Sequence, residues 1–226
     1  MRLKDKTAIV TGGASGFGKG IATRFAAEGA QVLVADLNGD GAASIANEIK
    51  GLSAEVDVSH DTDWRTMTSK ALGAWGRIDI LVNNAGITHL PQPMEDVTEQ
   101  DFDRVLSVNA KSVYLSARHI VPAMKQAGGG AILNVASTAG VSPRPNLNWY
   151  NASKGWMITA TKAMAVELAP SGIRVNALNP VAGETPLLAS FMGQDTPEIR
   201  AKFLSTIPLG RFSTPEDLAN AALFLC

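Results

Sequence analysis

Short apolar runs alternate with longer segments of helical periodicity along almost the whole chain. Each run ends at glycine or polar residues, and apolar residues at helical spacing follow. Strands separated by helices are typical of parallel sheets, because parallel strands need long crossover connections. The sequence therefore predicts an α/β fold, with a parallel sheet covered by helices on both faces. The predicted strands are residues 7–10, 31–35, 54–58, 78–82, 131–135 and 174–178.

The intervening segments carry helix start and stop signals. A Thr-Glu-Gln-Asp run at 98–101 predicts a capped helix start, and Pro215 after Thr214 predicts another. A segment at 180–208, rich in Pro, Gly, Met and Phe, is expected to be a loop with short helical pieces. No linker or repeat interrupts the pattern, so residues 1–226 are predicted to form one domain. The predicted helices are residues 19–28, 41–50, 61–75, 95–127 in two parts, 149–169 and a last one from about 214.

The composition excludes several classes of protein. A net charge of -1 gives no reason to expect a nucleic-acid partner. One cysteine, Cys226, and three scattered histidines predict no disulfide and no metal site. The charged N-terminus is unlike a signal peptide, and no apolar run approaches the ~18 residues of a membrane span. A cytoplasmic protein without a membrane partner is the resulting expectation.

A glycine-rich segment, Thr11 to Gly18, lies between the first strand and the first helix. Gly12 permits a tight turn, Gly16 lets a phosphate approach the backbone, and Gly18 allows close packing of helix and strand. The N-terminus of the helix offers free N–H groups to a pyrophosphate. A simple turn is the alternative for a glycine cluster alone, but its place between a strand and a helix favours dinucleotide binding.

Asp36 stands at the end of the second strand, about twenty residues further on. A carboxylate there can accept hydrogen bonds from an adenosine ribose and would repel the 2′-phosphate of NADP. The alternative is an aspartate that caps a turn or a helix. With the glycine loop upstream, the ribose role is favoured and the predicted cofactor is NAD rather than NADP.

Tyr150 and Lys154 are four residues apart, so they share one face of a helix. A phenol titrates near ~10, and a nearby ammonium is expected to lower that pKa and make the tyrosine a general acid or base. Ser137, thirteen positions upstream, could hydrogen-bond a substrate oxygen. Taken alone, the pair also fits a solvated helix face.

Together these residues resemble the short-chain dehydrogenase/reductase family from residue 3 to the C-terminus. Within it the chain most resembles bacterial 3-oxoacyl-acyl-carrier-protein reductases and glucose or secondary-alcohol dehydrogenases. The resemblance implies a Rossmann-like doubly wound sheet in a three-layer α/β/α fold, and often a homotetramer. The residues that carry it stand in one order: Gly12, Gly16, Gly18, Asp36, Asp57-Val58, Asn83-Asn84-Ala85-Gly86, Asn109, Ser137, Tyr150 and Lys154.

The resemblance also implies the roles of the site residues. Tyr150 exchanges a proton with the substrate oxygen, Lys154 binds the nicotinamide ribose, and Ser137 orients the carbonyl. Asn109 holds a water that links Lys154 to solvent, and Thr185 binds the carboxamide. The expected catalytic residues are Asn109, Ser137, Tyr150 and Lys154. The expected cofactor-binding residues are Gly12, Ser15, Gly16, Phe17, Gly18, Asp36, Leu37, Asp57, Val58, Asn84, Ala85, Gly86, Tyr150, Lys154, Pro180 and Thr185.

Two features depart from the family pattern. Pro180-Val181 stands where the family usually has Pro-Gly, and the valine is expected to move the backbone near the nicotinamide. Family members continue past the last helix into a seventh strand, whereas this chain ends at Cys226. Either the sequence is truncated or that strand is absent.

Other residues leave alternatives open. His89 could touch substrate, but a surface loop position is favoured. Arg144 could meet an anionic substrate or a carrier protein, or lie solvated in its loop. Trp149 is expected to pack, and the alanine-rich helix 152–169 is expected to be buried between subunits as well as in the core. An apolar group is predicted to form a substrate lid rather than a plain packing face: Leu187, Leu188, Phe191 and Met192.

The predicted function is that of an NAD(H)-dependent oxidoreductase that transfers a hydride between nicotinamide and a secondary alcohol or ketone. The first alternative is an NADPH-dependent 3-oxoacyl-acyl-carrier-protein reductase. Such enzymes usually carry a basic residue where this chain has Ala14, Ser15 and Leu37. The second alternative, from another class, is a non-catalytic dinucleotide sensor. The sequence does not name the substrate, because fold-level analogy does not transfer it.

Overall fold

The six strands form one parallel sheet, as the alternation of apolar runs predicts. The computed structural model describes residues 1–226. The strand order is β3-β2-β1-β4-β5-β6, so the chain reverses direction across the sheet between β1 and β4. This confirms the Rossmann-like doubly wound fold. The strands are β1 (Thr7–Thr11), β2 (Gln31–Asp36), β3 (Leu52–Glu55), β4 (Ile80–Asn83), β5 (Gly130–Val135) and β6 (Ile173–Leu178).

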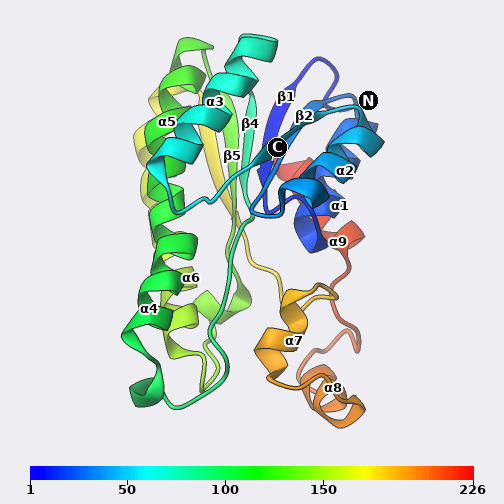
Figure 1. Cartoon of the computed structure of the whole chain (residues 1–226), viewed down its shortest axis with the longest axis vertical. Coiled ribbons are helices and arrows are strands. Elements are labelled where there is room, and N and C mark those ends of the chain that lie inside the picture. The colour runs from blue at the N-terminus through cyan, green and yellow to red at the C-terminus, as the bar shows by residue number, and fades with distance from the viewer.

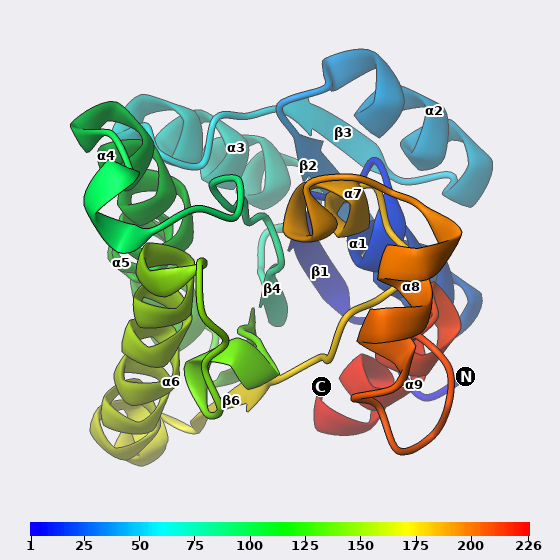
Figure 2. The ribbon, with the colours of Figure 1, turned by 90° about the horizontal axis from the view of Figure 1, so that it is seen from below.

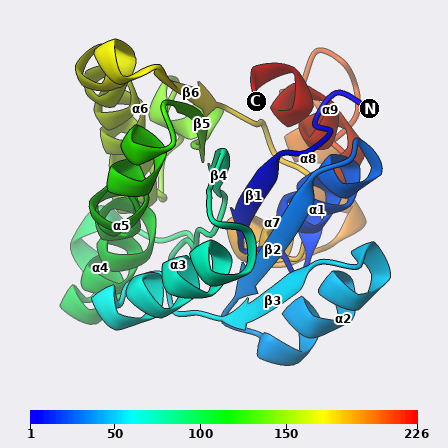
Figure 3. The ribbon, with the colours of Figure 1, turned by 90° about the horizontal axis from the view of Figure 1, so that it is seen from above.

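Helices cover both faces of the sheet (Figure 1). The helices are α1 (Gly16–Ala27), α2 (Gly39–Ile49), α3 (Asp61–Trp75), α4 (Glu99–Leu106), α5 (Ser112–Gln126), α6 (Asn148–Leu168), α7 (Leu187–Met192), α8 (Pro197–Leu204) and α9 (Pro215–Leu225). Helices α1, α2 and α9 pack on one face, and α3, α5 and α6 pack on the other. Figures 2 and 3 show the same three layers from below and from above.

The alternation of side chains along each strand builds two hydrophobic cores. On β1, Val10 faces α1 and α9, whereas its neighbour Ile9 faces the opposite layer. On β2, Val34 and Leu33 divide in the same way. All four side chains are fully buried, which is why these strands read as continuous apolar runs rather than as alternating ones.

The third strand differs from its predicted range of 54–58. Its register with β2 ends at the pair Asp36–Glu55, because β2 itself ends at Asp36 and offers no further partner. Val56 and Val58 are still buried, but in the core under α3 rather than in the sheet. An alternating Val-Asp-Val run thus looks like a strand in sequence and is in fact the turn into α3.

The predicted helical segment 95–127 contains one distinctive turn. A short 3-10 turn, Met94–Asp96, precedes α4, and Thr98 caps α4 by accepting a hydrogen bond from Asp101 N at 3.1 Å. A π-helical turn, Ser107–Lys111, then joins α4 directly to α5. Such turns are rare and often mark functional sites.

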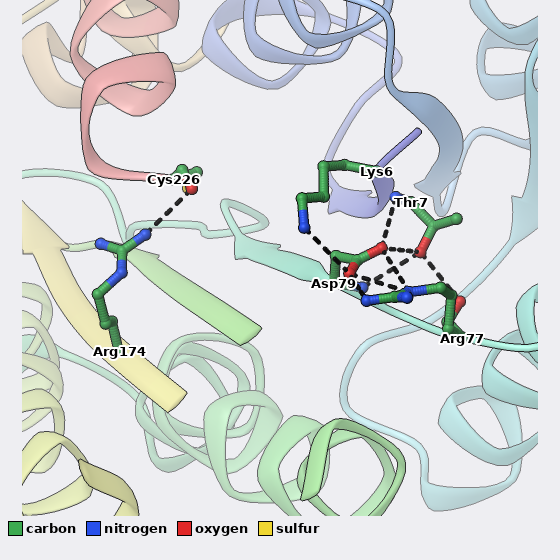
Figure 4. Close-up of polar contacts among 6 residues, drawn as sticks. All are labelled: Lys6, Thr7, Arg77, Asp79, Arg174 and Cys226. Atoms are coloured by element: carbon green, nitrogen blue, oxygen red, sulfur yellow. Dashed lines mark hydrogen bonds and ion pairs between the residues drawn. The ribbon is translucent and has the colours of Figure 1, made fainter. Parts of the chain in front are cut away.

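Asp79 joins the beginning of β4 to the beginning of β1 (Figure 4). One carboxylate oxygen accepts hydrogen bonds from Thr7 N at 3.0 Å and from Thr7 Oγ1 at 3.1 Å. Arg77 and Lys6 supply positive charge beside it. Burial raises the pKa of Asp79, but the hydrogen bonds from Arg77 and Thr7 outweigh burial and hold the pKa below its usual value. The carboxylate therefore stays ionised and links the amino-terminal ends of β1 and β4, at the end of the sheet opposite the predicted site.

Helices α7 and α8 lie apart from the sheet, below it in Figure 1. They pack around a small core of their own: Leu188, Met192, Ile207 and Phe212. Val181 packs against this core, so the residue that replaces the usual glycine has a definite place. The segment 180–208 thus contains short helical pieces within a loop, as predicted, and these pieces pack together as a small helical subdomain. None of the helices is both long and apolar enough to cross a membrane.

Candidate active site

A cleft of ≈ 480 Å³ opens at the carboxyl ends of the strands, within the size range of small-molecule sites. In open α/β sheets ligands bind at this edge, where the strand order reverses. Almost every predicted site residue lines the cleft, and only Gly18 and Asn109 do not. Those that line it are Gly12, Ser15, Gly16, Phe17, Asp36, Leu37, Asp57, Val58, Asn84, Ala85, Gly86, Ser137, Tyr150, Lys154, Pro180 and Thr185.

The glycine loop has the geometry that its sequence predicts. Gly12 and Gly16 adopt φ of +63° and +53°, where a side chain would be strained. A Cβ at Gly18 would lie 2.0 Å from the carbonyl oxygen of Gly12, so this glycine allows α1 to pack against the turn. Helix α1 begins inside the loop, at Gly16, and Ser15 makes no side-chain cap. The first N–H groups of α1 therefore remain available at the mouth of the cleft.

Asp36 is held between the glycine loop and the following turn. Its Oδ2 accepts a hydrogen bond from Ala14 N at 3.0 Å, and its Oδ1 accepts one from Asn38 N at 2.9 Å. Asp36 therefore does cap a turn, as the alternative predicts, but these two hydrogen bonds do not use all the acceptor positions of its carboxylate. A carboxylate has about four lone-pair positions, so two remain for a ligand in the cleft.

Asp57 lies at the same end of the cleft, beyond β3. Its Oδ1 accepts hydrogen bonds from Ser59 N at 2.8 Å and from Ser59 Oγ at 2.7 Å. Burial raises the pKa of Asp57, but these two bonds and the nearby positive charge of Lys111 oppose it, and the pKa lies below its usual value. With Asp36, it makes this end of the cleft negative and rich in acceptors.

Tyr150 and Lys154 project into the cleft from α6, and Ser137 meets them from the end of β5. Burial raises the pKa of Tyr150 to about 12, and the hydroxyl of Ser137 opposes part of that change. Burial lowers the pKa of Lys154 to about 8. The expectation of a lowered pKa for Tyr150 is therefore wrong, because burial outweighs the groups around the phenol. The Lys154 ammonium donates a hydrogen bond to the carbonyl of Val135 at 2.9 Å.

Asn109 lies in the π-helical turn behind the cleft and is fully buried. Its Nδ2 donates to Ile87 O at 2.9 Å and to Ser153 Oγ at 3.0 Å, and its Oδ1 accepts from Ile87 N at 2.9 Å. A Cβ at Gly86 would lie 3.2 Å from Lys154 Nζ and 3.4 Å from Asn109 Oδ1. Gly86 thus leaves space where these two polar groups converge.

A buried polar network fixes α6 to the sheet. Asn83 donates to Asn134 Oδ1 at 2.8 Å and to Ser116 Oγ at 2.9 Å. Asn134 in turn donates to Thr161 Oγ1 on α6 at 2.9 Å. The network ties β4 and β5 to α5 and α6, so it orients the helix that carries Tyr150. Asn134 and Thr161 are not predicted as site residues, because no local sequence pattern indicates their hydrogen bond between the sheet and α6.

The predicted lid residues divide between two faces of α7. Leu188 and Met192 belong to the core of the helical subdomain, whereas Leu187 and Phe191 line the cleft. The Phe191 ring meets the Tyr150 ring edge to face, with centroids 4.9 Å apart. Two of the residues therefore pack in the subdomain core, and two face the cleft, where the lid role stays a prediction.

Three further residues for which the sequence leaves alternatives open, Trp149, His89 and Arg144, have definite positions in the structure. Trp149 packs against Phe102 at 5.3 Å and donates to Met94 O, which confirms a packing role. His89 is fully buried and does not line the cleft, so neither a surface position nor a substrate contact is correct. Burial of a loop histidine depends on distant packing and leaves no local sequence signal. Arg144 lies at the rim of the cleft, part-buried.

The residues fit a dinucleotide. Two glycines with positive φ form a cradle beside the free N-terminus of α1, and Asp36 and Asp57 offer acceptors at one end. A Cβ at Gly16 would lie 3.1 Å from Thr185, so the α7 segment closes over the cradle. An elongated ligand would run from the acidic end past the cradle to Tyr150.

This fold and this cleft define the chain as a member of the short-chain dehydrogenase/reductase family, and thus as an oxidoreductase that acts on CH–OH groups. A family model described as enoyl-(acyl carrier protein) reductase matches residues 12–226. Similar proteins include 4-formylbenzenesulfonate dehydrogenase TsaC1/TsaC2 of Comamonas testosteroni, 52% identical over 100% of this chain and 92% of the relative. The 3-oxoacyl-[acyl-carrier-protein] reductase FabG of Thermotoga maritima is 41% identical over the same shares.

Solved structures agree with this family. A 3-ketoacyl-(acyl-carrier-protein) reductase from Brucella melitensis, complexed with NADH, has a TM-score of 0.94 and 50% identity, over 99% of this chain and 91% of that one. A 7α-hydroxysteroid dehydrogenase, complexed with NADH and 7-oxo glycochenodeoxycholic acid, has a TM-score of 0.94 and 37% identity, over 100% of this chain and 88% of that one.

Proposed function

We propose that the chain is an NAD(H)-dependent oxidoreductase that transfers a hydride between nicotinamide and a secondary alcohol or ketone. One observation carries the proposal: Tyr150, Ser137 and Lys154 open into the same cleft as the glycine cradle. A cradle alone would suit a dinucleotide sensor, the alternative from another class. A buried phenol beside a buried amine and a hydroxyl has no purpose in such a sensor.

Each polar side chain has a separate part in the proposed reaction. The cofactor supplies or accepts the hydride, which is chemistry that no side chain can perform. Ser137 donates a hydrogen bond to the substrate oxygen and holds it beside Tyr150. The phenol of Tyr150 gives its proton to that oxygen during reduction and takes one during oxidation. Phe191 and the burial of Tyr150 exclude water from this step.

Lys154 and Asn109 serve Tyr150 and the cofactor in this proposal. Lys154 binds a ribose hydroxyl and holds positive charge near the phenolate, which forms during reduction and takes up a proton during oxidation. With a pKa of about 8, the amine is largely ionised at neutral pH. Asn109 would hold a water in the space beside Gly86, through which a proton can pass from Lys154 to solvent. Pro180 and Thr185 would flank the nicotinamide.

Asp36 supports NAD over NADP as the cofactor. Its two remaining lone-pair positions suit the ribose hydroxyls of NAD. A 2′-phosphate would bring like charge beside it at ~4 Å, which costs about 4 kcal/mol at an effective dielectric constant of 20. The residues beside it in the glycine loop and the following turn, Ala14, Ser15, Leu37 and Asn38, are not basic.

An acyl-carrier-protein ketoreductase that uses NADPH stays the rival within the family. It draws support from the relative and the solved neighbour that bear such names. The substrates named for the similar proteins differ widely, from an aromatic aldehyde to a steroid. The name of a relative therefore does not identify the substrate of this chain. The Asp36 carboxylate argues against the NADPH-dependent rival.

We also infer a homotetramer formed through α5 and α6. Large apolar side chains are exposed on these helices: Tyr114 at 54%, Trp156 at 45% and Val166 at 79%. Such side chains on adjacent helices favour burial against another copy. A cytoplasmic location stays a prediction.

A turnover assay over a panel of ketones and alcohols, run with NADH and NADPH or with their oxidised forms, tests the function. The expected result is turnover of at least one ketone, with kcat/KM higher for NADH by at least about tenfold. Equal or better use of NADPH would favour the ketoreductase. Cofactor binding without turnover of any substrate, including acyl thioesters, would favour the sensor.

A further inference from the structure

The substrate end of the cleft carries a cation that the proposed chemistry does not use. The charged side chains that line the cleft are Asp36, Asp57, Arg144 and Lys154. The two aspartates lie at the opposite end, and Lys154 serves Tyr150. Arg144 alone remains, in the loop between Ser137 and α6, and no acidic side chain lines the cleft near it.

Arg144 is fixed in place without a carboxylate partner. Its guanidinium lies 5.1 Å from the centroid of the Phe203 ring and donates to Thr206 Oγ1 at 2.9 Å. Its backbone carbonyl accepts a hydrogen bond from Asn151 Nδ2 at 2.7 Å. A guanidinium is always ionised and carries five N–H donors, so most of its donors have no partner within the protein.

A second arginine on the same subdomain shows what a structural role looks like. Arg200 lies 5.9 Å from the Phe212 ring and donates to Asp195 Oδ2 at 2.8 Å, and Glu184 lies 3.9 Å away. It is neutralised and does not line the cleft. Arg144 stacks on an aromatic ring in the same manner but faces the cleft with its charge unpaired.

The walls near Arg144 define the rest of the ligand. Leu147, Val181, Leu187, Phe191 and Phe203 line this part of the cleft, and Tyr150 stands at its inner end. A ligand that satisfies all of them has an apolar body, a carbonyl or hydroxyl at one end and an anion at the other. Carboxylate and sulfonate match the forked donors of arginine with two parallel hydrogen bonds.

We propose that Arg144 is the anion-binding residue of the substrate site, and that the natural substrate is an alcohol or ketone bearing a carboxylate or sulfonate on an apolar body. This proposal rests on the oxidoreductase function proposed above. Arg144 does not take part in the chemical step. It determines specificity by pairing with the charged end of the substrate while Tyr150 and Ser137 hold the reacting end.

Matched acids and esters test the proposal. The two pairs are 4-acetylbenzoate with its methyl ester, and 4-oxopentanoate with its methyl ester. With saturating NADH, we expect the wild type to prefer the acid of at least one pair by about tenfold or more in kcat/KM. Arg144→Gln should lower kcat/KM for that acid by at least about tenfold and change the ester by less than about threefold. Arg144→Lys should restore part of the loss.

Two control variants distinguish a loss of anion recognition from a general loosening of the helical subdomain. Arg200→Gln removes the paired arginine and should leave the ratio of acid to ester unchanged. If Arg144 only tethers its loop to Thr206, Arg144→Gln will lower acid and ester alike, and Thr206→Val will do the same. That outcome, or a wild type that uses acids and esters equally in both pairs, overturns the proposal.

A binding measurement keeps this proposal distinct from the proposed function. Each acid is titrated calorimetrically into the protein mixed with NADH, and into Arg144→Gln treated in the same way. A dissociation constant at least about tenfold weaker in the variant supports the anion site even if no ketone is turned over. Failure of turnover with intact acid binding overturns only the enzymatic function. Equal binding of acid and ester, or no binding of either acid, overturns the anion site.

Discussion

Tyr150 and Lys154 lie one helical turn apart, and burial pushes both side chains toward their neutral forms. The pKa of the phenol is raised to about 12 and that of the amine is lowered to about 8. The spacing of the pair in sequence predicts their common cleft correctly. It does not predict these pKa values, because they depend on the solvent that the rest of the fold excludes.

Substitution of Lys154 by methionine should stabilise the protein while it impairs cofactor binding. The lowered pKa of Lys154 corresponds to a folding cost of ~3 kcal/mol at pH 7. Loss of the hydrogen bond to Val135 O destabilises the variant by about 1 kcal/mol. The net increase in unfolding free energy should therefore be about 2 kcal/mol. Urea unfolding at fixed protein concentration measures this gain.

The pH dependence of that gain follows from the sign of the shift. A lysine whose pKa is lowered on folding binds fewer protons in the folded state, between its folded value of about 8 and its unfolded value of ~10.4. The cost is complete below pH ~8 and disappears above ~10.4, so wild-type stability should rise across this window. A flat difference between wild type and Lys154→Met from pH 7 to 10 would contradict a buried ionised lysine.

Asp36 allows a prediction about the cofactor. Asp36→Asn keeps an amide oxygen that can accept from Ala14 N or Asn38 N, and it removes the charge. We therefore expect the ratio of kcat/KM for NADH over NADPH to fall by at least about threefold without loss of fold. Steady-state kinetics with both cofactors measures the ratio. An unchanged ratio would indicate that Asp36 does not face the ribose.

At the scale of elements, the alternation of apolar runs predicts the sheet and most of its boundaries. Helix α3 begins and ends at its predicted residues, and β6 differs by one residue. The misplaced third strand has a physical cause, because Val56 and Val58 are buried in a turn by a core that lies outside their local sequence. The π-helical turn at Asn109 likewise depends on tertiary packing.

The link between β1 and β4 should be sensitive to charge. Asp79→Asn keeps an acceptor for Thr7 but removes the attraction to Arg77 and Lys6, so we expect a loss of about 2 kcal/mol in unfolding free energy at pH 7. The folded pKa of Asp79 is lowered, so its stabilisation is complete above the unfolded value of ~3.9 and is lost as the pH falls through the folded value. The difference between the two proteins should therefore shrink below pH ~4. A difference that stays the same from pH 7 down to pH 3 would contradict the ionic link.

For the whole molecule, the exposed faces of α5 and α6 predict assembly. Trp156→Arg places a charge in the proposed interface and should convert the tetramer to a smaller species. Light scattering coupled to size-exclusion chromatography measures the mass. Leu209→Arg is the matched control, since Leu209 is 82% exposed beyond α8 and outside these helices. A wild-type monomer, or a tetramer unaffected by Trp156→Arg, would contradict this interface.

The arrangement of the whole molecule follows from the sequence more readily than its substrate does. The spacing of glycines, aspartates and the tyrosine–lysine pair predicts where a dinucleotide and a reacting carbonyl meet. The walls of the substrate end come from α7, α8 and the loop that holds Arg144, whose contact with Phe203 joins distant parts of the chain. No local pattern indicates that contact, and it is there that specificity must be sought.

The central claim is that Tyr150 exchanges the proton in a hydride transfer. The most direct test is the rate of NADH oxidation by Tyr150→Phe, with the best ketone of the panel, beside NADH affinity measured by fluorescence. The variant removes one buried hydroxyl and keeps the ring contact with Phe191. We predict a fall in kcat of at least ~10²-fold with NADH affinity nearly unchanged. A variant that retains more than about a tenth of wild-type kcat would contradict the account.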